Sequence, residues 1–225
     1  MGKFLATGGT MLLSVFTYAF VFGWRYAVGF VGLLLVHEMG HFLAAKQRGL
    51  DVGAPTFIPF VGAWIQLKEQ PHDAETEAFV GIAGPMLGSA AAFVCYLLAR
   101  ETGSSLLLAL SYSGFILNLF NLIPITPLDG GRIVAVISPR IWLLGIPLLA
   151  GLFLLKPSPL LLLIAVVAIP QAWRTLRDPE TTASAYYQAA PSVRYQYAFQ
   201  YLVLAALLAI MAFEAHEMLT AGRLR

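Results

Sequence analysis

The sequence has 225 residues, of which 59% are hydrophobic and only 12% are charged. Because soluble domains carry roughly 25% charged residues, this composition excludes an ordinary soluble protein. This apolar composition makes the lipid bilayer the expected partner. The net charge of +2 forms no basic block, so we expect no nucleic acid as a partner. The length suits an integral membrane protein with several spans of about 20 residues each.

Apolar runs of about the length that crosses a bilayer recur along the chain. They lie at about residues 4–24, 26–45, 78–99, 106–123 and 195–213. The first run is longer than a signal-peptide core and lacks a small-x-small cleavage site, so we expect it to be a retained anchor. Placing the N-terminus in the cytosol puts most Lys and Arg residues on the cytosolic side, as the positive-inside rule requires.

Three further segments complete the expected fold. Two shorter apolar runs, 141–155 and 160–173, flank the sequence KPSP and form either one broken span or, as the charges favour, a helical hairpin. Residues 51–70 mix β-branched and aromatic residues with Gly and Pro. We therefore predict an all-α polytopic membrane protein with about six to seven transmembrane or re-entrant helices, and a short membrane-associated β or re-entrant segment at about 51–70.

The second apolar run contains the motif HEMGH, which puts three polar residues into an otherwise apolar segment. On a helix, His37 and His41 project from one face about one turn apart, which suits two ligands of one metal ion. Glu38 then stands where it can act as a base beside the metal without being a ligand. A charged residue near a membrane helix centre costs about 2.5–3.5 kcal/mol, and a shared cation offsets that cost. The alternative is two hydrogen-bonded core histidines beside an interfacial carboxylate.

A catalytic zinc ion usually has three protein ligands, so the two histidines need a third. Apart from Glu38, the acidic residue deep in a predicted span is Asp129, in NLFNLIPITPLDGGR. Pro124 and Pro127 remove backbone donors, so the helix entering from residue 106 must break here. Irregular backbone at membrane depth is tolerated where protein or a wet cavity satisfies it, which makes Asp129 a candidate ligand. Alternatively, Asp-Gly-Gly simply makes a turn.

The two motifs together resemble those of the site-2 protease family of intramembrane zinc metalloproteases. The signatures of that family are H-E-x-x-H and N-x-x-P-x-x-x-L-D-G. The second signature is matched here by Asn121, Pro124, Leu128, Asp129 and Gly130. The paired motifs are far more specific than either one alone, and the likeness covers about residues 26–140.

The resemblance implies one Zn²⁺ ion per chain, held by His37, His41 and Asp129. It also implies that Glu38 is the general base and that Asn121 helps to hold the substrate peptide near the metal. The function it implies is an intramembrane zinc endopeptidase that cleaves transmembrane segments of membrane-anchored protein substrates.

We expect a single membrane domain, 1–225, with a catalytic core at about 26–140 and C-terminal helices at about 141–213. The expected location is the plasma membrane, and the sequence does not indicate an oligomeric state. The main alternative function is a non-catalytic, metal-binding membrane adaptor of the same fold. A metal transporter is less favoured because it would give no reason for Glu38 beside the first ligand. A protease of prenylated proteins would be expected to supply a glutamate as its third ligand, and the motif that contains Asp129 argues against that class.

The segment GIAGPMLGS resembles a family region that often carries an asparagine shortly after A-G-P. Gly88 and Ser89 stand in that region here, so no role of an asparagine is transferred. We expect Gly81, Gly84 and Gly88 to allow close packing between helices.

Overall fold

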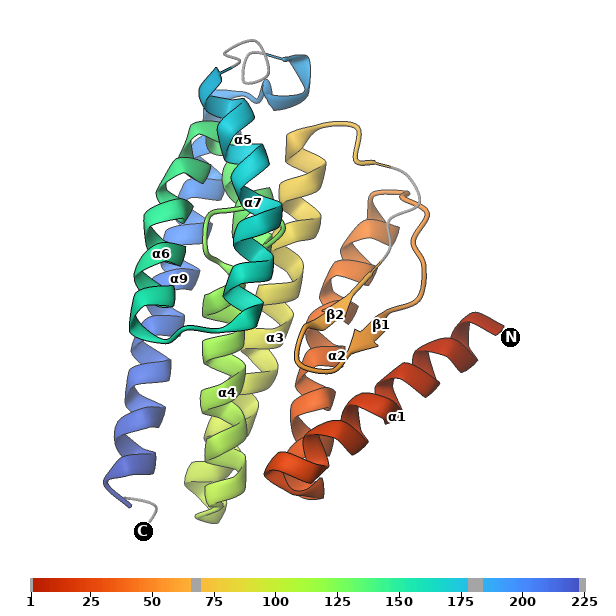
Figure 1. Ribbon diagram of the computed structural model, residues 1–225, viewed down its shortest axis with the longest axis vertical. Coiled ribbons are helices and arrows are strands. Elements are labelled where there is room, and N and C mark those ends of the chain that lie inside the picture. Colours follow the sequence, from red (N-terminus) through yellow and green to blue (C-terminus); the bar gives the residue numbers. More distant parts are fainter. Residues whose placement is uncertain (1, 66–69, 178–183, 223–225) are drawn as a thin grey trace. The chain divides into compact units, whose positions relative to one another are not determined.

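The computed structural model describes residues 2–65, 70–177 and 184–222 (Figure 1). Helices dominate, with one short hairpin of strands, which confirms the predicted fold class. In chain order the elements are α1 (Gly2–Phe22), α2 (Trp24–Gln47), β1 (Thr56–Ile58), β2 (Gly62–Trp64), α3 (Ala74–Thr102), α4 (Ser105–Asn121), α5 (Asp129–Ile137), η1 (Pro139–Leu144), α6 (Gly145–Leu155), α7 (Pro159–Arg177), η2 (Ala185–Tyr187) and α9 (Pro191–Thr220).

Most of these helices are apolar along much of their length. Among the described residues, α2, α3, α7 and α9 are long and apolar enough to cross a membrane. Three shorter apolar helical stretches accompany them, at Ala6–Phe22, Ser105–Asn121 and Pro139–Leu155. The chain is therefore a multi-pass integral membrane protein.

The chain divides into two compact units. The first contains α1, α2, the β hairpin, nearly all of α4 and the larger part of α3, and the second contains α5, η1, α6, α7 and η2. Helices α3 and α9 contribute residues to both units. Each unit has its own buried apolar contacts.

In the first unit, the β hairpin packs on α1 and α2. Strands β1 and β2 pair antiparallel, with Phe57 opposite Ala63. The buried Phe57 side chain joins Tyr18 and Val31 in one apolar cluster, and the Tyr18 hydroxyl accepts a hydrogen bond of 3.0 Å from the Phe60 N–H. The expected β segment is thus confirmed, while residues 66–69 of that segment lie outside the described residues.

In the second unit, the backbone leaves its helix after Asn121 and a new helix, α5, begins at Asp129. The helix break expected from the prolines is confirmed. The alternative that Asp-Gly-Gly only makes a turn is wrong, because these residues are the first three of α5. An aspartate in a first helical turn is favoured by the helix dipole. Trp142 of η1 holds the start of α5 by donating a 2.8 Å hydrogen bond to the Gly131 carbonyl.

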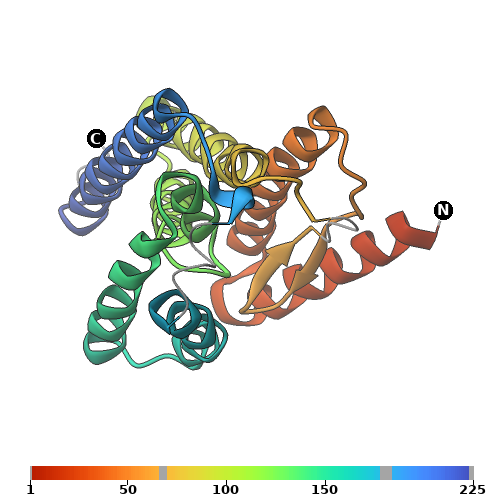
Figure 2. The ribbon, with the colours of Figure 1, turned by 90° about the horizontal axis from the view of Figure 1, so that it is seen from above.

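The two shorter apolar runs form separate helices, α6 and α7, on either side of residues 156–158. The two helices lie side by side (Figure 2). The expectation of a helical hairpin is therefore confirmed, and the alternative of one broken span is wrong.

Candidate metal centre

His37 and His41 lie one turn apart on α2, with only 3% and 7% of their surfaces exposed. Their rings are nearly perpendicular, at 81°, and the two Nε2 atoms face each other at 3.2 Å. Helical spacing accounts for this arrangement, since side chains at positions i and i+4 overlie one another. Two imidazole nitrogens are thus directed at one buried point.

The ring of His37 is held from α4. Its Nδ1 atom lies 2.8 Å from the Oδ1 atom of Asn118, which is itself 1% exposed. The Asn118 amide nitrogen donates a 2.7 Å hydrogen bond to the Gly114 carbonyl of the same helix. Both polar ends of the Asn118 side chain are therefore satisfied inside an apolar helix bundle.

Helices α2 and α3 approach each other closely beside these histidines. A Cβ atom built on Gly40 would lie 2.8 Å from the Ala83 carbonyl carbon and 2.9 Å from the Gly84 Cα atom, so the backbones themselves are in contact. A Cβ atom on Gly84 would collide with the His41 ring. The expectation that these glycines allow helix packing holds at this crossing, and Gly84 also leaves the space that the His41 imidazole fills.

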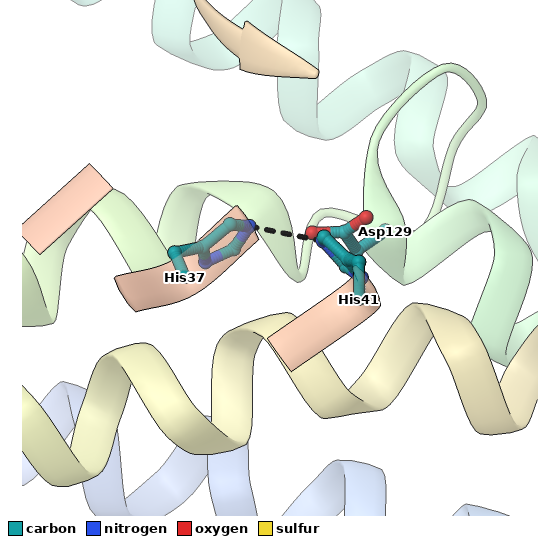
Figure 3. A group of neighbouring side chains, drawn as sticks. All are labelled: His37, His41 and Asp129. Carbon is teal, nitrogen blue, oxygen red and sulfur yellow. Dashed lines mark hydrogen bonds between the residues drawn. The ribbon is translucent and has the colours of Figure 1, made fainter. Parts of the chain in front are cut away.

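Glu38 and Asp129 are also buried, at 4% and 7% exposure. Glu38 follows His37 on α2, and Asp129 is the first residue of α5. Figure 3 labels the two histidines and Asp129, and its dashed line marks the contact between the two imidazole rings. These are the three side chains from which the sequence predicts a metal site.

The donor set can be compared with the needs of a zinc ion. A tetrahedral ion with bonds of about 2.05 Å to nitrogen holds two ligand atoms about 3.3 Å apart. The 3.2 Å between the Nε2 atoms of His37 and His41 agrees with that separation. Imidazole and carboxylate groups are ligands that zinc accepts where thiolates are absent. The residues present therefore fit a zinc ion.

Other residues singled out in the sequence have simpler positions. Asn121 is the last residue of α4 and is half-buried, and its role toward a substrate stays a prediction. His72 and His216 are exposed, in keeping with their location outside the HEMGH and LDGG motifs. Sequence reasoning did not identify Asn118, although an amide in an apolar helix one turn before Asn121 is a signal that could have been used.

Comparisons with known proteins find similarity in the region that contains HEMGH. Residues 25–104, which include HEMGH, match the model of peptidase family M50. Zinc metalloprotease MJ0392 of Methanocaldococcus jannaschii is 33% identical over 116 residues, which are 49% of this chain and 33% of that protein. The probable chloroplastic zinc metalloprotease EGY1 of Arabidopsis thaliana is 41% identical over 69 residues, which are 28% of this chain and 13% of that protein.

The matched region spans a third or less of the length of these curated relatives. Among solved structures, the site-2 protease from Methanocaldococcus jannaschii is similar with a TM-score of 0.48 and 22% identity, over 80% of this chain and 87% of that one. Residues 25–104 are thus similar to peptidase family M50, in agreement with the resemblance that the motifs of the sequence indicated.

Proposed function

We propose that this protein is a zinc endopeptidase that cleaves membrane-anchored proteins within or beside their transmembrane segments. The observation that carries the proposal is the pair of buried imidazoles on α2, whose Nε2 atoms face each other at 3.2 Å, together with the buried carboxylate at the start of α5. Buried ionisable groups in membrane helices are costly and therefore point to function. The curated relatives that share this region are named as zinc metalloproteases.

His37, His41 and Asp129 are the proposed ligands of one zinc ion per chain. A bound zinc ion would polarise a peptide carbonyl, and it would lower the pKa of a bound water molecule so that hydroxide is available at neutral pH. Glu38 is the proposed general base, whose carboxylate accepts the proton of the attacking water and then passes it to the leaving amine. Asn121 is proposed to hold the substrate peptide close to these groups.

The substrate helix must unwind before its peptide bond can be attacked, because a helix hides its carbonyl groups in its own hydrogen bonds. The freed backbone groups then need partners. The β hairpin formed by β1 and β2 supplies strand edges of the kind that pair with an extended peptide. We propose that the unwound substrate is held by pairing with this hairpin.

The remaining features of the proposal concern the whole chain. We place the catalytic core at about residues 26–140 and supporting C-terminal helices at about 141–213 of a single membrane domain, 1–225. The N-terminus is proposed to lie in the cytosol and the protein in the plasma membrane. The orientation is supported by the distribution of Lys and Arg residues between the ends of the apolar runs.

The test compares purified wild type with Glu38→Gln in detergent, using model transmembrane peptides and zinc analysis. We expect one zinc ion per chain in both proteins and a loss of cleavage of about 10²–10⁴-fold in the variant, as for removal of a general base. Glu101→Gln is the matched control, since Glu101 is exposed near the end of α3 and is expected to leave both readouts unchanged.

Two outcomes would contradict the proposal in different ways. Equal cleavage by wild type and Glu38→Gln would remove Glu38 from the base role. Stoichiometric zinc without cleavage by any of the proteins would favour the alternative of a non-catalytic, metal-binding membrane adaptor.

A further inference from the structure

The Asn118 side chain is oriented by its own helix. Its nitrogen lies 2.7 Å from the carbonyl oxygen of Gly114, which can only accept a hydrogen bond. The opposite end of the amide, facing His37, must therefore be the oxygen Oδ1. Since an amide oxygen can only accept, the Nδ1 atom of His37, 2.8 Å away, must carry the hydrogen.

This hydrogen bond decides which nitrogen of His37 can bind a metal. A neutral imidazole has one protonated nitrogen and one nitrogen with a free lone pair. With the hydrogen on Nδ1, the lone pair is on Nε2, the atom that faces Nε2 of His41 at 3.2 Å. Ligand histidines usually donate their other ring hydrogen to a partner that fixes the tautomer and the ring orientation.

The partner on α4 is a neutral amide, which suits its surroundings. Asn118 is 1% exposed, and a charged group inside a membrane helix is costly. An amide oxygen satisfies the Nδ1 hydrogen of His37 without adding a charge. A carboxylate would also accept a hydrogen bond from Nδ1, but it would add a charge.

The neighbouring helix α3 leaves space for this amide. A Cβ atom built on Gly88 would lie 2.6 Å from Oδ1 and 3.0 Å from Nδ2 of Asn118, both closer than ordinary contact. Glycine at position 88 is therefore needed for the amide to stand between the helices. The atoms that a side chain at position 88 would meet belong to the amide group of Asn118 itself.

We propose that Asn118 is a positioning residue that fixes His37 in the tautomer with hydrogen on Nδ1 and directs its Nε2 atom to the metal. The proposal rests on the assignment of His37 as a zinc ligand in the proposed function. An amide that served only to join α2 and α4 would affect the stability of the helix bundle. It would have no particular effect on the metal.

The experiment uses the full chain in detergent with ¹⁵N-labelled histidine. The chain has four histidines, so long-range ¹H–¹⁵N spectra of the zinc-free protein can resolve the ring nitrogens, with His37→Ala used for assignment. Zinc affinity is measured in parallel by competition with a chelator. The variants are Asn118→Leu, which removes the acceptor, and Asn118→Asp, which retains it.

Ser111→Ala is the matched control, because Ser111 is equally buried on α4 but donates its hydrogen bond to Leu108 of its own helix. We expect the wild type to show the Nδ1-protonated tautomer at His37. Asn118→Leu should give a mixture of tautomers and zinc binding weakened 10–100-fold, the usual effect of losing such a partner. Asn118→Asp should retain the tautomer, and Ser111→Ala should match the wild type in both measurements.

Each contrary result has a separate meaning. An Nε2-protonated His37 in the wild type would overturn the proposal without any variant having to fold. Zinc binding by folded Asn118→Leu equal to that of the wild type would overturn the positioning role alone. Failure of the wild type to bind zinc would overturn the proposed function and this role with it.

Discussion

The space at Gly84 gives the sharpest prediction about the metal centre. A Cβ atom added there would lie 2.7 Å from Cδ2 of His41 and closer still to two other ring atoms, whereas ordinary contact begins at 3.4 Å. In Gly84→Ala the ring must therefore retreat by at least about 0.7 Å. Ligand positions in metal sites are defined to within about 0.2 Å, so the displaced ring cannot keep its place as a ligand.

We expect the zinc dissociation constant of Gly84→Ala to rise by at least tenfold, which corresponds to about 1.4 kcal/mol. Cleavage should fall by about 100-fold, the loss that a displacement of about 1 Å can cause. Overpacking of this kind also costs about 1–3 kcal/mol of stability. The assays are chelator competition for zinc, peptide cleavage in detergent, and thermal unfolding of the zinc-free protein.

Gly32→Ala is the control on α2, because a Cβ atom at Gly32 would meet nothing within 4 Å. It should bind zinc like the wild type and unfold at the same or a slightly higher temperature, since alanine favours helix more than glycine by about 1 kcal/mol. Folded Gly84→Ala with wild-type zinc affinity would refute the reasoning, because the His41 ring would then have another place from which to bind.

Three further predictions concern other parts of the molecule. Ala63→Pro in β2 should slow cleavage of a helical substrate while leaving zinc content unchanged, and unchanged turnover would exclude pairing of the substrate with this strand. Removal of zinc by a chelator should lower the unfolding temperature reversibly, and free zinc at 100 times its dissociation constant should restore about 2.7 kcal/mol. Gly131→Ala would put a Cβ atom 2.7 Å from the Ile125 carbonyl oxygen, so calorimetry should show a loss of about 1–3 kcal/mol, whereas Gly151→Ala, with nothing within 4 Å, should be neutral.

Most of the apolar helices could be predicted from the sequence to within a few residues, because the thickness of the bilayer sets the length of each run. The expected run 78–99 lies inside α3 (Ala74–Thr102), and 106–123 nearly coincides with α4 (Ser105–Asn121). The prolines also predicted where α4 must end. Hydropathy did not predict α5, because this nine-residue helix is too short to be recognised by its apolar length and begins inside the irregular segment.

The candidate metal site could be predicted only in part, because the spacing of residues determines geometry within one helix but not the contacts between helices. His37 and His41 are related by local helical geometry, which the spacing of four residues determines. The contact between His37 and Asn118 spans 81 residues of sequence and depends on how α2 and α4 are rotated toward each other. No periodicity within either helix specifies that rotation. The space at Gly84 likewise follows from the crossing of α2 with α3 and not from any local pattern.

Buried polar groups in the first unit explain why these glycines accompany the motif. A polar side chain in an apolar bundle must meet a partner, and the partner itself must be satisfied, so one histidine requires a chain of groups. Here His37 meets Asn118, and Asn118 meets the Gly114 carbonyl. Each additional polar group needs room between tightly packed helices, which Gly88 provides by lacking a side chain. The histidines of HEMGH are therefore accommodated in this apolar setting because other helices supply a hydrogen-bond partner for His37 and space beside both the partner and His41.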